Sequence, residues 1–214
     1  MAAIAVMLVA VLVVGGTLAY FTDTKSATNT FTVGDVKIKL DESNVNDPDG
    51  DRVTSNEYTG MLPGIQYKKD PVVTNTGKNG AYVRAVVTIE NGMNWMGLYN
   101  ENVWTAPQAE AFKKLICNKM GEGWSLEDYN YVTNAERGST DFVAVLKYDG
   151  VLAAGKATTA MFENIMLPTN ATASDITTRV AQNGVFHIDV VAQAIQADGF
   201  TSWNDAFKAF DAQK

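Results

Sequence analysis

Threonine and serine alternate with other residues through a short segment near the start of the chain. Every even position in this segment holds one of the two: Thr22, Thr24, Ser26, Thr28, Thr30 and Thr32. Side chains on a β-strand alternate between its two faces, and the branched Cβ of Thr suits the pleated backbone, so the pattern predicts a strand. This strand has too little apolar surface to order itself. We therefore expect it to complete a sheet that belongs to something else.

An uncharged apolar run precedes this strand. Residues Met1–Val14 are apolar throughout, which is typical of the core of a signal peptide and close to the minimum for a membrane-spanning helix. Thr17 and Ala19 supply the small residues that a signal peptidase recognises, so we expect cleavage between Ala19 and Tyr20. No Lys or Arg precedes the run, which indicates either a truncated start or atypical targeting. We expect a cleaved leader rather than a retained anchor.

Composition limits the class of fold and function. The chain has 214 residues, of which 46% are hydrophobic and 19% charged, as expected of a folded domain with a buried core. A net charge of -7 and a pI of about 4.7 argue against nucleic acid and anionic lipid as main partners. The single cysteine, Cys117, cannot form an internal disulfide. The single histidine, His187, leaves little room for metalloenzyme or triad chemistry.

Two long segments alternate with the period of a β-strand. Ala81–Glu90 places an apolar row on one face, made of Ala81, Val83, Ala85, Val87 and Ile89. Val185–Ala197 does the same with Phe186, Ile188, Val190, Ala192 and Ala194. Less regular strands are expected at Phe31–Leu40, Tyr67–Thr76, Trp124–Val132, Asp141–Tyr148 and Ala157–Leu167. Several short strands and few helices predict a mainly β fold, an antiparallel β-sandwich of the jelly-roll type.

The remaining segments are expected to be connections and short helices. Asp41–Gly60 is polar and predicts a long loop or a loosely held hairpin, and Asn91–Trp104 also predicts a loop. A capping box at Thr105–Gln108 predicts a helix that runs to about Lys119. One helical turn is expected after Ser174. Ser202 is predicted to cap a tail helix whose apolar side carries Trp203, Ala206, Phe207 and Phe210.

Three features could carry chemistry, and each has a simpler structural interpretation. Asp47, Asp49 and Asp51 offer clustered oxygen ligands for calcium, but they lack the EF-hand spacing and its closing glutamate, so a solvated turn is expected. His187 lies opposite the core-facing row of its strand and is expected to be a structural residue. Cys117 lies beside the apolar face of the predicted helix and is expected to be a small buried hydrophobe. The sequence therefore assigns no catalytic, cofactor-binding or firm metal-binding residue.

Several stretches resemble one known family. The leader GGTLAYFTD, which begins at Gly15, and the following TNTFTVGDVKIKL resemble the leader and mature N-terminus of the TasA/camelysin family, the biofilm fibre proteins of Gram-positive bacteria. Two further stretches carry the resemblance into the domain, PVVTNTGKNGAYVRAVVTIE and VFHIDVVAQAIQADGF. Asn91–Asn183 matches no family pattern.

The resemblance implies a jelly-roll subunit that polymerises by donor-strand exchange after a dedicated signal peptidase has cut its leader. The implied donor residues are Phe21, Asp23, Lys25, Ala27, Asn29, Phe31 and Val33. Of these, Phe21, Ala27 and Phe31 are expected to enter a groove of the next subunit. The expected organisation is a signal peptide at 1–19, a donor strand at 20–33, a jelly-roll domain at 34–200 and a C-terminal amphipathic helix or tail at 201–214.

Two function classes follow. The first is a secreted structural subunit of an extracellular fibre, in a biofilm matrix or pilus-like, that is no enzyme and needs no cofactor. Its partners would be identical subunits and, during export, the signal peptidase, with no nucleic acid, no small-molecule substrate and only transient membrane contact through the leader. The alternative is a cell-surface metalloprotease of the camelysin type, for which the sequence supplies no recognisable zinc ligands. A pilin-like retained helix is a third interpretation, but the chain lacks the acidic residue and the pre-pilin cleavage pattern.

Overall fold

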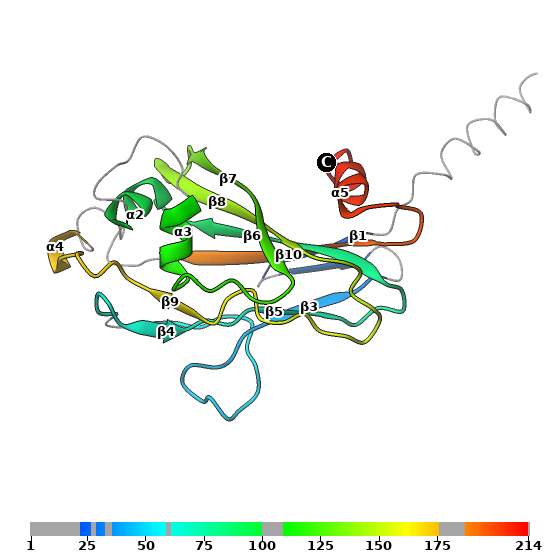
Figure 1. The fold of residues 1–214 in the computed structure, drawn as a ribbon, viewed down its shortest axis with the longest axis horizontal. Coiled ribbons are helices and arrows are strands. Elements are labelled where there is room, and N and C mark those ends of the chain that lie inside the picture. The colour runs from blue at the N-terminus through cyan, green and yellow to red at the C-terminus, as the bar shows by residue number, and fades with distance from the viewer. Residues whose placement is uncertain are drawn as a thin grey trace, which may run out of the picture.

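A six-stranded antiparallel sheet is the centre of the fold in the computed structural model, which describes residues 22–26, 29–32, 36–58, 61–99, 109–175 and 187–213. The strand order is β2-β1-β10-β6-β8-β7. In that order the strands are Asn29–Thr32, Thr22–Ser26, Ile188–Gln196, Ala81–Ile89, Ser139–Tyr148 and Trp124–Asn134. Figure 1 shows β10, β6, β8 and β7 of this sheet beside one another. The last strand in sequence, β10, therefore lies between the first strand, β1, and the central strand β6.

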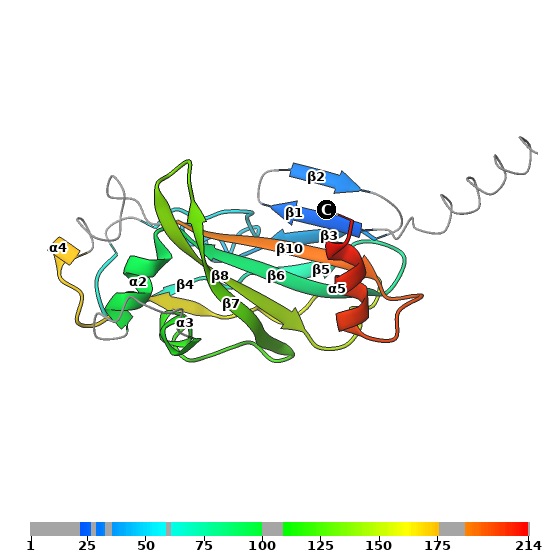
Figure 2. The same cartoon turned by 90° about the horizontal axis from the view of Figure 1, so that it is seen from above.

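A second layer of two short sheets covers one face of this sheet. One pairs β3 (Ile38–Asp41) with β5 (Val72–Asn75), and the other pairs β4 (Gln66–Lys68) with β9 (Asn164–Met166). Helices α2 (Gly92–Tyr99) and α3 (Ala109–Leu115) continue the covering layer, and the one-turn helix α4 is Ala173–Asp175. Antiparallel layers with short helices in the connections confirm the predicted mainly β class (Figure 2). Among the described helices, none has the length and apolar character needed to cross a membrane.

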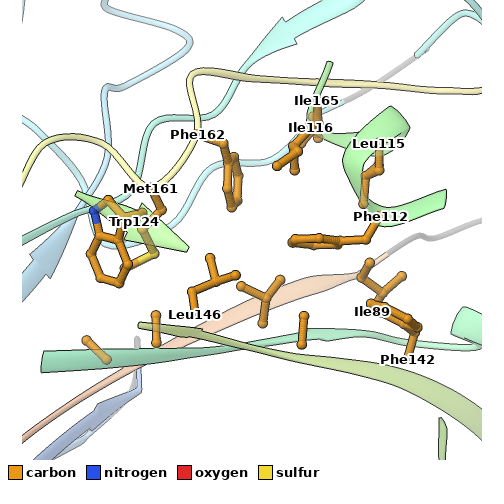
Figure 3. Packing of buried hydrophobic residues seen from close by; sticks show 14 of the residues in the cluster. Ile89, Phe112, Leu115, Ile116, Trp124, Phe142, Leu146, Met161, Phe162 and Ile165 are labelled. Carbon is orange, nitrogen blue, oxygen red and sulfur yellow. The ribbon is translucent and has the colours of Figure 1, made fainter. Parts of the chain in front are cut away.

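The core fills the space between the two layers. The predicted apolar row of β6, from Ala81 to Ile89, is fully buried at every second position. Figure 3 shows Ile89, Phe142 and Leu146 of the main sheet facing side chains of the covering layer. That opposite side consists of Phe112, Leu115, Ile116, Met161, Phe162 and Ile165, all buried, and Trp124 at the start of β7 packs beside Met161. Alternation along β6 thus predicted its buried face correctly, because a covered sheet must put its apolar row toward the cover.

The predicted loop at Asn91–Trp104 is wrong over its described part, because residues Gly92–Tyr99 form helix α2. Trp95 and Met96 are fully buried in the core, so the aromatic and apolar side chains of this segment are structural. Gly92 lies so close to β8 that an added Cβ would stand 2.2 Å from the backbone nitrogen of Phe142. Only glycine lets the helix start this close to the sheet. The start of the predicted helix at Thr105–Gln108 and Trp104 lie outside the described residues.

Two predicted strands are shorter than expected. Tyr67–Thr76 is not one edge strand but two, β4 and β5, in different sheets on either side of Lys69-Asp70-Pro71. Pro71 has no N–H for a ladder, and the chain changes sheet there. Ala157–Leu167 contains only β9 as a regular strand, with single bridges that include Ala157 and Phe162.

The polar segment Asp41–Gly60 is held firmly over its described part, not loosely. Glu42 and Val53 exchange two backbone hydrogen bonds of 2.8 Å, and Lys69 donates to Glu42 across 2.9 Å between two buried side chains. Arg52 Nε lies 2.5 Å from Asp41 Oδ1, and Arg52 Nη2 donates to the carbonyl of Asp70 over 2.7 Å. Buried charges of opposite sign thus pair in the interior of this hairpin, which explains how acidic residues can be buried here.

The tail helix α5 (Trp203–Asp211) packs against the opposite face of the main sheet. Ser202 is its N-cap and accepts a hydrogen bond from the backbone N–H of Asp205, as predicted. The predicted apolar side of the helix is buried, consisting of Trp203, Ala206, Phe207 and Phe210. Trp203 Nε1 donates to the carbonyl of Val83 over 2.9 Å, which anchors the helix to β6. Both faces of the middle strands are therefore covered.

Candidate assembly site

The first described strand, β1, lies antiparallel beside β10 and extends the main sheet on that side. Its register pairs Thr22 with Ile195, Asp23 with Ala194, Thr24 with Gln193 and Lys25 with Ala192. β3 lies against both strands, so β1 has β10 at its side and β3 across its face (Figure 2). The sequence predicted that this polar segment completes a sheet that belongs to something else, and in the single chain the sheet that it extends is the chain's own.

The acceptor strand β10 carries small residues where β1 pairs with it. Ala192 and Ala194 are fully buried on the core face, and Ile195 is fully buried on the face that α5 covers. Val190 is only half-buried, although it was predicted to be in the core. Val190 packs against the core cluster without being enclosed by it, and it lies before the part of β10 that pairs with β1.

The segment 22–32 is not the single continuous strand that its alternation predicted. β1 and β2 form an antiparallel hairpin in which Asp23 pairs with Thr32 and Ser26 pairs with Asn29. The Thr and Ser alternation favours extended backbone, but it does not encode where the extended chain reverses. Of the expected donor residues, Asp23 and Lys25 lie in β1 and Asn29 and Phe31 in β2, whereas Phe21, Ala27 and Val33 fall outside the described residues. The expected cleavage point at Ala19 and Tyr20 also lies outside them.

Arg84 holds the acceptor strand from its outer side. This side chain extends from β6, and its Nε donates to Gln193 Oε1 of β10 over 2.6 Å. Its other two nitrogens donate to Asp211 of α5. Gln193 is also the register partner of Thr24, so the network ends at the residue of β10 that lies beside the middle of β1. By its position in the alternating strand, Arg84 lies opposite the apolar row of β6, but nothing in the sequence indicates that α5 buries it.

The other candidate residues are not brought together. His187 is exposed just before β10, and Cys117 is half-buried after α3, not fully buried as expected. Burial raises the pKa of the Cys117 thiol, which favours the unreactive protonated form. Cys117 has φ 57, in the left-handed region, and together with Asn118 it ends the helix.

The described residues do not fit a metal centre. Asp47, Asp49 and Asp51 are exposed in the hairpin that follows β3. Over the described ranges, no three His, Cys, Asp or Glu side chains are grouped so that they could hold a metal ion. Carboxylates that lie close together elsewhere, such as Asp41 and Asp70, are already paired with Arg52.

One protein-family model matches the first part of the chain. The family model described as camelysin metallo-endopeptidase matches residues 1–77. The match confirms the resemblance to the TasA/camelysin family. Within its described part, the matched region contains β1, β2, β3, β4 and β5. It therefore includes the hairpin of β1 and β2, and also β3, which lies across the face of β1. No curated protein and no solved structure matches the chain.

The family match and the fold divide the chain differently. The camelysin model ends at residue 77, before the alternating stretches Ala81–Glu90 and Val185–Ala197, where the sequence also resembles the family. These two stretches form β6 and β10, which pair along nine positions, and β10 in turn carries β1. The strand beside which β1 lies could not be found from the sequence, because alternation marks a strand but not its neighbour.

Proposed function

We propose that this chain is a secreted structural subunit of an extracellular fibre, and that subunits join head to tail through their N-terminal strand. One observation carries the proposal. β1 pairs along one side with β10, the last strand of the chain, while β1 itself comes from the other end of the sequence. An element near a chain end can leave its own sheet and enter that of a neighbour without any crossing of the chain.

Exchange of β1 between subunits conserves the pairs of the single chain. The same register, from Thr22 with Ile195 to Lys25 with Ala192, would form between two molecules. The number of backbone hydrogen bonds between β1 and β10 is then the same in the single subunit and in the fibre. The protein concentration and the geometry of the connection to β3 therefore decide whether β1 stays in its own subunit or enters a neighbour. If each subunit gives its strand to the next one and receives a strand from the previous one, the contacts are head to tail and the product can grow as an open fibre.

The donor can enter either as a hairpin or as one extended strand. A hairpin inserts β1 alone, whereas an opened segment also brings Phe31 toward the acceptor. Substitution Phe31→Asp should weaken fibre formation more than Thr28→Asp if the segment opens, since a buried Phe contributes about 1.5–3 kcal/mol. Equal effects of the two variants on fibre mass in sedimentation would indicate a hairpin donor.

Deletion of residues 20–30 tests whether this segment is the donor. The protein should remain folded by circular dichroism but stay monomeric in sedimentation, with lower stability because the place beside β10 is empty. Fibres of normal appearance in electron microscopy from the deleted protein would show that another segment joins the subunits.

Disulfide trapping tests the register directly. Two proteins are mixed before assembly, both with Cys117→Ser, one with Lys25→Cys and the other with Ala192→Cys. Residues directly opposite in an antiparallel pair have Cα atoms about 4.5–5.5 Å apart, within the range of a disulfide. The matched control replaces Ala192→Cys by Ala85→Cys, one strand further into the sheet. Cross-linked dimers are expected only with the Ala192→Cys protein, and fibres without such dimers would refute strand exchange at this edge.

The family name supports a second candidate, a cell-surface metalloprotease. This function predicts stoichiometric zinc and cleavage of casein by the purified protein, and His187→Ala tests the single histidine. We propose that neither activity is present, because the described residues group no set of metal ligands. Zinc-dependent hydrolysis that disappears in the His187→Ala variant would favour the protease.

A further inference from the structure

The main sheet has an edge strand at each end. β2 and β1 end the sheet on one side, and β7 (Trp124–Asn134) ends it on the other. In the part of the chain that the structure describes, no strand pairs with the outer side of β7. An edge strand of eleven residues is a template for strand addition by another chain.

The side chains of β7 increase this hazard. Tyr129 is 38% exposed and Val132 is 49% exposed, so the strand carries apolar surface beside its open backbone. Both belong to the residue types that favour strands. A long edge with exposed β-forming residues is expected to pair with other chains unless a local feature prevents it.

Two polar side chains accept hydrogen bonds from backbone N–H groups of this edge strand. The N–H of Tyr129 donates to Asp128 Oδ1 over 2.8 Å, and the N–H of Tyr131 donates to Asn130 Oδ1, also over 2.8 Å. The two N–H groups are two residues apart. In an antiparallel pair, every second residue of an edge strand directs its N–H group away from the neighbouring strand. An incoming strand would have to displace both side chains before it could form its first hydrogen bonds.

An irregularity lies at the same place. The register between β7 and β8 shifts between Leu126 and Asp128, so Glu127 is an extra residue on the edge strand. Bulges twist an edge strand and interrupt the flat row that a partner needs. The bulge and the two capped N–H groups all lie between residue 127 and residue 131.

We propose that Asp128 and Asn130 close the β7 edge against strand addition. The consequence for assembly rests on the proposed fibre function: with β7 closed, an incoming donor strand is not accepted at this end of the main sheet, and fibres do not join sideways through β7. The two residues are thus specificity determinants for which edge accepts a partner.

The test compares three full-length variants with the original protein. The double variant Asp128→Val, Asn130→Val removes both caps. The single variant Asp128→Asn removes the same charge but keeps an Oδ1 acceptor at each position. The swap Asp128→Asn, Asn130→Asp keeps both caps and the net charge. Folding of each is checked by cooperative urea unfolding, and Asp128→Ala, Asn130→Ala replaces the valine variant if that protein does not fold.

Light scattering and hydrogen exchange give the result whether or not fibres form. The uncapped variant should at least double its scattering mass relative to an equally concentrated control, and amide exchange in residues 127–134 should slow as that mass grows. If fibres form, electron microscopy should show them bundled side by side. The single Asp128→Asn variant and the swap should behave as the original protein does. An uncapped, folded protein with unchanged mass and unchanged exchange in β7 would overturn the proposal, while absence of fibres from all proteins would count only against the fibre function.

Discussion

Arg84 and Asp211 are joined by two hydrogen bonds although 127 residues separate them in the chain. Arg84 Nη1 lies 2.8 Å from Asp211 Oδ2, and Nη2 lies 2.5 Å from Oδ1. The guanidinium also lies 4.4 Å from the ring centre of Phe207 and 5.1 Å from that of Phe210. This bidentate pair and the two rings fasten the end of α5 to the middle of the main sheet.

The first prediction concerns this contact. Arg84→Ala should lower the free energy of unfolding by about 1–3 kcal/mol, because the side chain is almost fully buried and provides both hydrogen bonds and packing. Asp211→Ala should cost less, about 1 kcal/mol, since this carboxylate is half-exposed and Arg84 keeps its bond to Gln193. Urea unfolding measures both, with the exposed Lys208→Ala in the same helix as the control. If Asp211→Ala lowered the free energy of unfolding as much as Arg84→Ala does, the bond between Arg84 and Gln193 and the packing of Arg84 would contribute nothing, and the prediction would be wrong.

The second prediction compares two valines that the sequence placed in equivalent rows. Val87→Ala should lower stability by about 1–3 kcal/mol, because Val87 is fully buried and its truncation leaves a cavity. Val190→Ala should cost clearly less, because Val190 is only half-buried. Val87 and Val190 are direct cross-strand neighbours, so the double variant also shows whether the two effects add. Equal single losses in urea unfolding would mean that Val190 is covered more fully than the single chain shows.

The third prediction concerns the start of α2. Gly92→Ala should destabilise the protein by roughly 1–3 kcal/mol, because the new Cβ would stand 2.2 Å from the backbone nitrogen of Phe142 and 2.8 Å from its Cα. Backbone cannot rotate away as a side chain does, so the helix or the strand must shift. In an exposed helix the same change would stabilise, since Ala favours helix over Gly. The sign of the change in the thermal unfolding midpoint therefore distinguishes a clash from a gain in helix propensity. A raised midpoint would contradict the close contact between Gly92 and Phe142.

The fourth prediction is a pH dependence that Asp70 produces. Burial opposes ionisation of this carboxyl, but hydrogen bonds from Ser43 and the charges of Arg52 and Lys68 lower its pKa below the ordinary value. A pKa that is lower in the folded state stabilises the protein above the unfolded value, and this contribution is lost as the pH falls through the folded pKa. Unfolding free energy should therefore fall below about pH 4.

The variant Asp70→Asn isolates this contribution. It should be less stable than the original protein at neutral pH and should lose less stability on acidification, measured by urea unfolding across the acid range. Asp49→Asn, at an exposed position of the nearby 41–60 hairpin, is the control and should follow the original protein. Parallel curves for the original and Asp70→Asn proteins would show that other carboxylates cause the acid loss.

Some features were predictable because they are local. The apolar row of β6 follows from alternation, which any covered strand must show, and the capped start of α5 follows from Ser202 and the spacing of its apolar side. The resemblance to the camelysin family was likewise visible in the leader and the first strands, and the camelysin match covers that part of the chain. In each case the signal lies within a few residues, so no knowledge of the neighbours was needed.

Other features depend on contacts between distant segments. The residues of α2 carry no clear helical period, and the helix exists because Trp95 and Met96 fill a place against β8. The change of sheet at Pro71 and the pairing of Arg52 with two carboxylates likewise depend on partners elsewhere in the chain. Propensity is a weak preference, and burial in the assembled core outweighs it.

The same distinction holds for the candidate assembly site. Period 2 and β-branched residues are local properties, so the amino-acid pattern alone predicts that residues 22–32 favour an extended conformation and need a sheet beside them. The reversal of this segment into β1 and β2, and its pairing with β10, whose Ala192 and Ala194 are small and buried, become visible only in the folded chain. Hydrogen bonds between strands join backbone groups that nearly every residue carries, so register and partner come from the packing of both faces, which no single segment encodes.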